Sequence, residues 1–523
     1  MFFRVAHSSF LLCVVMVLFA PAFAAADKAS EVKTPVPVRH KKDADQAPKE
    51  STALPALLSL NKAKEVALRE NPSLQAGASR VEQAKLRVKQ MRASFFPLVE
   101  ASLSGTDTWL DAQTYSQQEQ LTALVQTQIS AVRTSQTNAL LSQLQTLGVN
   151  APSDAVQTLT GILFSDTTTQ LQKNYVDYRL AVTARWQLFD GLSREFGYAA
   201  AKVGAREADA AFLEGKRLLL SGVATSYFTA LLAREEIAVT EADEAYNIRL
   251  KKEAETRYEA GAAGFSDTLN FEVRSNLSHN DVIRAKQGYV EARVALAGLL
   301  GLSEGALPDD VQLEPLEDET ERELENPPLN DLLVYAKSNR PDLEQADLAI
   351  DRTNASAKAW HGQMLPSVGL SATEAAVDRN GLSISSDNRI AAVSVGVSQT
   401  LFAGGRIKAK WEEAKVAHAE ARHSRDATEI KVASEVRNAH EKLLAAQQQL
   451  HLQRSNAGLV QQYRDLVEQG YLAGQLDLVQ LNQAQRDLTA AQGQLVLARV
   501  GVRQAWHDLY TAAGKTLEGL PEE

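Results

Sequence analysis

Cysteine is almost absent from this chain of 523 residues, where Cys13 is the only one. It lies in an N-terminal segment in which Arg4 precedes an apolar run at 10–20 and a small-x-small cleavage pattern, as in export signals. We expect residues 1–24 to be a removed signal peptide and residues 25–56, rich in Lys, Pro, Asp and Ala, to be a disordered lead-in. A mature chain without cysteine cannot be a small disulfide-held domain.

Several other features are scarce, and each excludes a function class. Aromatic residues make up 6% of the chain, which is low for a densely packed globular enzyme. Lys and Arg number 55 against 65 Asp and Glu, without a basic patch, so no nucleic-acid partner is expected. No HExxH, GxSxG or metal-spaced histidine pair occurs, and His418, His423 and His440 lie at spacings that do not place two of them one turn apart. We predict no enzyme activity, cofactor or metal site.

The chain contains an internal duplication, which organises the rest of the sequence. At a shift of 269 residues, NPSL at 71–74 matches RPDL at 340–343, and FFP at 95–97 matches MLP at 364–366. At a shift of 213 residues, LFDG at 188–191 matches LFAG at 401–404, YEAG at 258–261 matches YLAG at 471–474, and Gly301 matches Gly514. The two shifts differ by 56 residues, so the first half carries an insertion of about that length.

Each repeat is predicted to contain a helix, two strands and a hairpin of two helices. The first repeat covers 57–301, with strands at about 98–109 and 176–189, and the second covers 329–514, with strands at about 366–373 and 390–402. An acidic linker at 302–328, bracketed by prolines, is expected to form a belt around the middle of the helices, and 515–523 is a tail.

The strands alternate apolar and polar residues with the same parity in both repeats. Arg179 and Arg185 fall on the polar face, whereas Trp109, Tyr178 and Trp186 bracket the apolar face like an aromatic girdle. Eight residues separate Tyr178 from Trp186, roughly 20 Å on a tilted strand, close to the height of an outer-membrane band. Half-buried strands of a soluble sandwich would share this alternation, and the girdle favours lipid.

The helices are unusually long. No proline occurs from about 192 to 257 or from about 406 to 469, and runs of roughly 65 residues would be about 100 Å long. Such lengths suit a structure that spans a periplasm, and a plain structural coiled coil is the alternative. Four strands cannot close a barrel, so several chains must share one, and three chains would supply twelve strands.

This order of elements, with two LF-x-G junctions and two Y-x-x-G turns, resembles the TolC family of outer-membrane efflux and secretion channels over residues 57–514. The resemblance implies a mainly α fold in which a homotrimer forms a 12-strand β-barrel in outer-membrane lipid and a long coiled-coil periplasmic tunnel in a Gram-negative bacterium. It implies a passive export duct of a tripartite efflux or type I secretion system, opened at its helical tip by a periplasmic adaptor (membrane fusion protein) and an inner-membrane pump. A non-conducting helical-hairpin adaptor or scaffold is the alternative.

The resemblance also assigns roles to the hairpin tips. It implies adaptor docking at the two turns, by Tyr258, Gly261, Ala262, Ala263, Tyr471, Gly474, Gln475 and Leu476. It implies a pore gate at Asp267, Asp477, Gln480 and Gln483.

The second tip departs from the family pattern. Gln480 and Gln483 stand where Asp is common, and Leu476 stands where some members have Arg, which weakens the case for an acidic gate and an Arg–Asp latch. We therefore expect weaker polar contacts at this tip and less discrimination among cations. Helix N-capping is the alternative role for Asp267 and Asp477.

The insertion at about 110–175 is the least family-like segment. Its Gln- and Thr-rich sequence carries Leu, Val and Ile at helical intervals. It predicts a helical external loop that caps or narrows the exit, with solvated decoration as the alternative.

Overall fold

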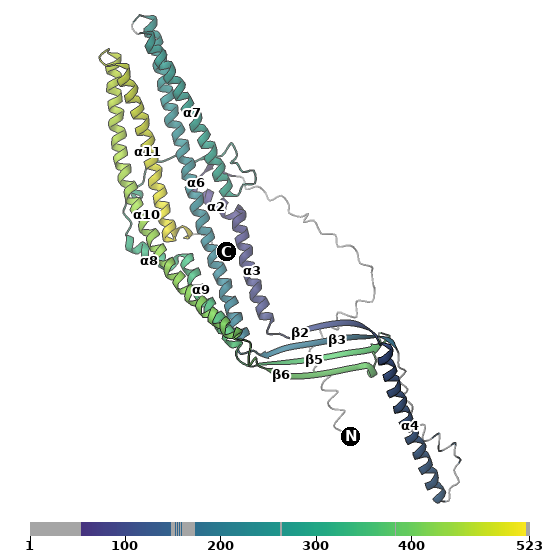
Figure 1. The fold of residues 1–523 in the computed structure, drawn as a ribbon. Coiled ribbons are helices and arrows are strands. Elements are labelled where there is room, and N and C mark those ends of the chain that lie inside the picture. Colours follow the sequence, from purple (N-terminus) through teal and green to yellow (C-terminus); the bar gives the residue numbers. More distant parts are fainter. Residues whose placement is uncertain are drawn as a thin grey trace. The chain divides into compact units, whose positions relative to one another are not determined.

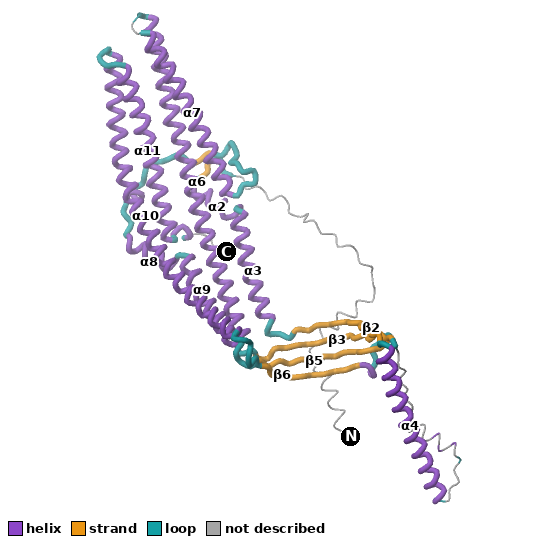
Figure 2. The backbone as a smooth tube through the Cα atoms, in the orientation of Figure 1, coloured by secondary structure: helices purple, strands orange, loops and turns teal. Residues whose placement is uncertain are grey.

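The computed structural model describes residues 54–147, 173–261, 264–381 and 383–518, together with residues 152, 154, 156 and 158. The expected signal peptide, nearly all of the lead-in and the last residues of the tail lie outside this part. The described chain is mainly helical, with one larger sheet (Figure 2). No helix within it combines the length and the apolar character needed to cross a membrane.

Four antiparallel strands form the larger sheet in the order β2-β3-β5-β6 (Figure 1). They are β2 (Leu98–Trp109), β3 (Asn174–Phe189), β5 (Ser367–Arg379) and β6 (Arg389–Ser398). Leu103 lies opposite Leu180, and Leu370 lies opposite Trp186, so the apolar residues of neighbouring strands share one face. Arg179 lies opposite Ser104 on the other face, as the alternation predicts.

Two strand boundaries differ from the expectation. The strand predicted at 366–373 continues to Arg379 as β5. The residues from Glu374 onward still pair with β3, and Arg379 lies opposite Asp177. The strand predicted at 390–402 ends at Ser398, because the turn at 404–405 leads the chain into the next helix.

The apolar face of the sheet also carries charges that the alternation did not predict. Glu374 lies opposite Val182, on the face that holds Trp186. It forms an ion pair with Arg389 of β6. The pair neutralises both charges, which lowers the cost of placing them among apolar neighbours.

Two helical hairpins form most of the molecule. The first consists of α6 (Ser193–Glu259) and α7 (Phe265–Leu300), and the second of α10 (Arg406–Leu472) and α11 (Leu478–Ala513). The long helices have 67 residues each and the returning helices 36 each. Because α6 packs against both α7 and α11, and α10 against α11, the helices form a row in the order α7-α6-α11-α10 (Figure 1).

A pair of short helices precedes each strand pair: α2 (Leu60–Glu70) and α3 (Pro72–Ala93) before β2, and α8 (Leu329–Asn339) and α9 (Pro341–Gly362) before β5. The single helix predicted before the strands of each repeat is therefore wrong, because two helices occupy that place in both repeats. Asn71 caps a new helix at Pro72 by accepting a hydrogen bond from the Ser73 amide at 2.9 Å.

Pro72 and Pro341 begin α3 and α9, and the residue before each of them anchors the short helices to a hairpin. Asn71 Nδ2 donates to the Leu299 carbonyl at 2.8 Å, near the end of α7. Arg340 Nη1 donates to the Ala512 carbonyl at 2.8 Å, near the end of α11. The fully buried Arg340 also pairs with Asp342 at 2.6 Å, so its charge is compensated.

The junction from β3 into α6 depends on close backbone approach. Gly191 adopts φ +71°, and a Cβ there would lie 2.1 Å from the Gly362 carbonyl oxygen at the end of α9. Only glycine fits this position. The contact fixes the start of the first hairpin beside the start of the second strand pair.

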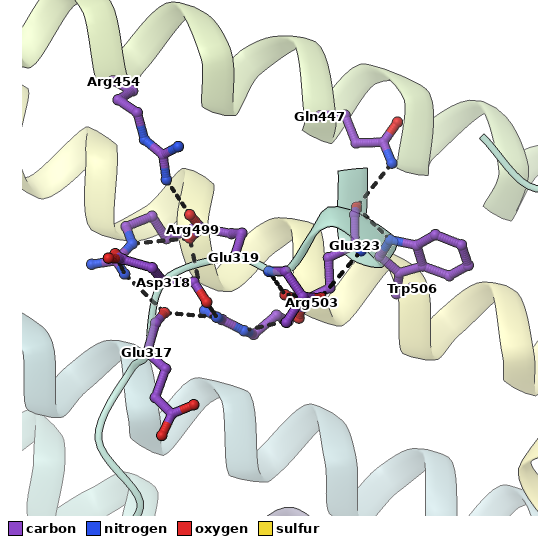
Figure 3. Close-up of polar contacts among 10 residues, drawn as sticks. Glu317, Asp318, Glu319, Glu323, Gln447, Arg454, Arg499, Arg503 and Trp506 are labelled. Atoms are coloured by element: carbon purple, nitrogen blue, oxygen red, sulfur yellow. Dashed lines mark hydrogen bonds and ion pairs between the residues drawn. The ribbon is translucent and has the colours of Figure 1, made fainter. Parts of the chain in front are cut away.

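The segment 302–328, called the belt below, contains β4 (Gln312–Leu313) and the short helix η1 (Glu321–Leu324), and β4 pairs in parallel with β1 (Leu57–Leu58). Arg293 of α7 donates to the Leu307 and Pro308 carbonyls, and Arg234 of α6 to those of Leu313 and Glu314. Further along, the belt contacts α11 and α10 (Figure 3). It therefore crosses the whole row of helices.

Two further short helices, η2 (Ser386–Asn388) and η3 (Lys515–Leu517), complete the described elements together with α4 (Ala112–Thr146). The helix α4 lies in the connection from β2 to β3, as predicted for the first part of the insertion. Because β2 enters the sheet from α3 and β3 leaves it into α6, this connection lies at the opposite end of the sheet from the hairpins.

Candidate functional site

The hairpin tips have matching turns. Gly261 and Gly474 adopt φ +70° and +73°, a left-handed conformation that glycine reaches without strain. Their amides donate to the carbonyls of Tyr258 and Tyr471, each at 2.9 Å. The two turns that the sequence matched therefore have the same local geometry, and the proposed docking residues Ala262 and Ala263 lie outside the described residues.

The two tip tyrosines differ in environment. Tyr258 is 46% exposed and contacts Phe265, with ring centres 5.6 Å apart. Tyr471 is half-buried and lies 6.3 Å from the ring centre of the buried Phe271 on the other hairpin. Tyr258 is thus available to a partner, whereas Tyr471 connects the hairpins.

The remaining docking residues lie just after the second turn. The Gln475 and Leu476 amides both donate to the Gly470 carbonyl, at 2.9 and 3.2 Å. Both side chains are exposed, Leu476 by 37%. The Leu476 side chain folds back over Gly470, where a Cβ would lie only 2.6 Å from its Cδ1.

The four predicted gate residues do not form one cluster of contacts. Asp477 is the N-cap of α11 and accepts a hydrogen bond from the Gln480 amide at 2.8 Å, so the capping role expected as an alternative is present. Asp267 lies in the first turn of α7 without capping it. Gln480 and Gln483 are exposed, and Gln483 donates to Asp487 at 2.7 Å.

The contact between the two tips comes from a residue that sequence reasoning missed. Arg257, near the end of α6, donates to the Leu472 carbonyl at 2.8 Å and lies 5.8 Å from the centre of the Tyr471 ring. Burial raises the pKa of Tyr471, and the negative charge of Asp267 adds to the rise. The arginine thus comes from the first hairpin and binds a carbonyl, in place of an Arg–Asp pair.

A second connection lies farther from the tips. Arg249 of α6 pairs with Glu468 of α10 at 2.5 Å. The guanidinium groups of Arg249 and Arg464 lie 5.1 and 4.8 Å from the centre of the Tyr246 ring. Burial raises the pKa of Tyr246 to about 12. Around it, buried apolar side chains from four helices form a core: Leu250, Ala254, Phe271, Val467, Leu481 and Ala484.

A groove of about 690 Å³ runs between α6, α7 and α11 below this core. Within it, Asp243 accepts hydrogen bonds from Gln485 Nε2 at 2.6 Å and from Thr489 Oγ1 at 2.8 Å. Charged residues of both hairpins line the groove, among them Arg274 and Arg486. The groove joins helices distant in sequence, so no local pattern could have predicted it.

The belt is fixed to the second hairpin through a buried carboxylate (Figure 3). The Glu319 side chain is fully buried and accepts a hydrogen bond from Arg499 Nε at 2.9 Å, and it pairs with Arg454 of α10. Burial by itself would raise the pKa of Glu319, but the hydrogen bond from Arg499, a backbone hydrogen bond and the charges of Arg499 and Arg454 together outweigh it, so the pKa is lowered. Arg503 donates to the Glu317 carbonyl at 2.7 Å. Ionic contacts therefore connect the belt with α10 and α11 at one level.

The predicted girdle residues lie at opposite ends of the strands. Trp109, the last residue of β2, is 76% exposed, and Tyr178 lies opposite Gly105 near the same end of the sheet. Trp186 is 40% exposed near the helical end, where its indole N–H donates to the Phe95 carbonyl at 2.9 Å.

Comparisons with known proteins agree with this arrangement. A sequence model of the family described as outer membrane efflux protein matches residues 64–302 and 332–515. The outer membrane efflux protein BepC of Brucella suis biovar 1 (strain 1330) is 26% identical over 350 residues, covering 65% of this chain and 73% of that protein. The pyoverdine export outer membrane protein OpmQ of Pseudomonas aeruginosa is 26% identical over 299 residues, covering 57% and 61%. The fold is similar to the CmeC outer membrane channel of Campylobacter jejuni, with a TM-score of 0.69 at 16% identity over 88% of this chain and 87% of that one.

Proposed function

Because the chain belongs to the outer membrane efflux protein family, we propose that it is the passive outer-membrane duct of a tripartite efflux or type I secretion system. It is an outer-membrane protein of a family of efflux channels, so the non-conducting adaptor considered above is not favoured.

The four-stranded sheet with open edges is the observation that carries the proposal. In the described chain β2 and β6 each pair with one strand only, so one long side of each strand offers unpaired N–H and C=O groups. These groups must be satisfied in a bilayer, and four strands are too few to close. Three copies joined β6 to β2 would give a closed barrel of twelve strands.

The row of helices supports the same assembly. Its two outer helices carry exposed apolar side chains at helical spacing: Ile283, Val290 and Val294 on α7, and Leu452, Leu459 and Leu466 on α10. Packing α7 of one copy on α10 of the next would bury both sets and close the row into a tunnel. Equal hairpin lengths and matching anchors at Asn71 and Arg340 support an origin of the two halves by duplication.

The hairpin tips are proposed as the gate and the docking site. Arg257 and Tyr471 hold the two tips of one copy together, so separating them would require breaking these contacts. A periplasmic adaptor would bind the exposed tip residues or the groove around Asp243. If it binds the open state of the tips more tightly than the closed state, its binding shifts the tips toward the open state. In this chain the contacts of Arg257 with Leu472 and Tyr471 would then keep the tips closed, in place of an acidic gate.

Conductance of the purified protein in planar lipid bilayers tests the proposal. We expect discrete current steps from the wild-type protein that are small because the tips are closed, and larger steps from Arg257→Ala, which loses the Leu472 hydrogen bond. Lys252→Ala is a matched control, because Lys252 is an exposed cation on the same helix. Absence of channel activity in all three proteins would refute the proposed function.

A further inference from the structure

The helix α4 has a composition unlike the other long helices of this chain. Among its 35 residues only Glu119 and Arg133 carry charge. It nevertheless exposes large apolar side chains, each between 43% and 63% accessible: Leu121, Leu124, Val125, Ile129 and Val132. They are spaced three, one, four and three residues apart, which places them on one side of the helix in a stripe along its middle, called the α4 stripe below.

The α4 stripe is a surface without a partner in the described chain. The less exposed residues of α4, such as Thr122, Gln126 and Thr137, lie on a different side of the helix. A helix gains most of its stability by burying its apolar face, and large side chains left in water forgo that gain. Five such side chains in contact with water indicate a packing partner.

We propose that the α4 stripe packs against the α4 stripes of neighbouring copies, so that three α4 helices form a collar outside the exit of the duct. This inference rests on the proposed trimer. Asp111 caps α4 only two residues after β2 ends at Trp109, accepting hydrogen bonds from the Gln113 and Thr114 amides at 2.9 and 2.8 Å. Because β2 is the edge strand that would meet the next copy, α4 begins at the boundary between copies.

The dimensions allow the three helices to meet. A barrel of twelve tilted strands is about 24 Å across, so the starts of the three α4 helices would lie about 20 Å apart. A helix of 35 residues is about 52 Å long, enough to lean over the exit and contact its neighbours. The stripe residues Leu121, Val125 and Val132, with Gln128 between the valines, follow the alternating four- and three-residue spacing of coiled coils.

The charge pattern favours identical copies over a membrane surface. Helices that lie on a bilayer carry Lys and Arg along their polar face, which α4 does not. Because neither Glu119 nor Arg133 belongs to the α4 stripe, packing three stripes together places no like charges within the contact. Its polar sides, made of Gln, Thr and Ser, remain suited to water.

Single cysteines in the full-length protein test the inference, because the chain has no cysteine beyond Cys13 in the expected signal. Val125→Cys places a thiol in the α4 stripe. Thr127→Cys is the matched control, since Thr127 is exposed on the opposite side of the same helix. A disulfide requires Cα atoms within about 7 Å, so under mild oxidation in isolated outer membranes Val125→Cys should form at least about tenfold more covalent dimer than Thr127→Cys.

Migration of the unheated protein on the same gels shows whether each variant assembles into trimers. Trimers with preferential Val125→Cys cross-links support the collar. Trimers in which Val125→Cys stays reduced, or in which both variants cross-link equally, overturn the collar and leave the duct intact. Absence of trimers in the unmutated protein refutes the proposed function, and the collar with it.

Discussion

Replacement of Glu319 by glutamine should weaken the attachment of the belt to the second hairpin. The Glu319 side chain is fully buried and is held by Arg499 at 2.9 Å, by Arg454 and, at 3.8 Å, by Arg503. Hydrogen bonds between charged groups contribute about 1.5–3 kcal/mol each, and Arg454 is half exposed, which weakens its share. We expect Glu319→Gln to cost about 2–3 kcal/mol of local stability, because three guanidinium groups lose their common carboxylate.

Hydrogen–deuterium exchange measured by mass spectrometry resolves this local effect. A loss of 2–3 kcal/mol should speed exchange in peptides covering 312–325 by about 30- to 150-fold if the belt opens locally. Glu317→Gln is the control: it removes an exposed carboxylate from the same belt and keeps the carbonyl that Arg499 and Arg503 bind. Unchanged exchange in Glu319→Gln, or equal acceleration in both variants, would refute the reasoning.

Three further predictions concern the tip, the core and a junction. Arg257→Ala should raise single-channel conductance while Lys252→Ala leaves it unchanged, and equal conductance in both would show that the Arg257 contact does not hold the tip. Burial and the nearby charge of Lys64 lower the pKa of His507 to about 4. The neutral His507 therefore stabilises the folded chain fully above the unfolded pKa near 6.5, and this contribution to the free energy of unfolding, about 3 kcal/mol per chain, is lost as the pH falls to 4. Urea unfolding at pH 7 and pH 4 should show this loss in the wild type and not in His507→Asn; an identical pH dependence in both would contradict it. Gly191→Ala should abolish trimers on unheated gels, because its Cβ would meet a backbone oxygen at 2.1 Å, whereas Gly215→Ala, with open space around it, should assemble normally.

The sequence predicted the elements better than their contacts. The absence of proline and the two Y-x-x-G turns were enough to place the long helices within a few residues, because helix length and turn geometry are local properties. Alternation likewise placed β2 and β3. It failed at β5, where Glu374 interrupts the apolar pattern and is tolerated only because Arg389 of the neighbouring strand neutralises it.

Contacts between distant segments explain what could not be predicted at the site. Arg257 and Leu472 are separated by 215 residues, and nothing near Arg257 in the sequence indicates that its guanidinium reaches a carbonyl of the other hairpin. Asp477 was predicted as a gate residue because it lies one helical turn from Gln480, but its place before α11 also makes it an N-cap, which the structure contains. Local sequence thus predicted the capping role, and only the fold could reveal the contact between tips.

The number of chains in the solubilised particle tests the central claim most directly. Light scattering on the detergent-purified protein, corrected for bound detergent, measures this number. Three chains are predicted, because the open edges of the sheet and the outer faces of α7 and α10 then satisfy one another. A particle of one chain, stable after the detergent is removed, would contradict the account.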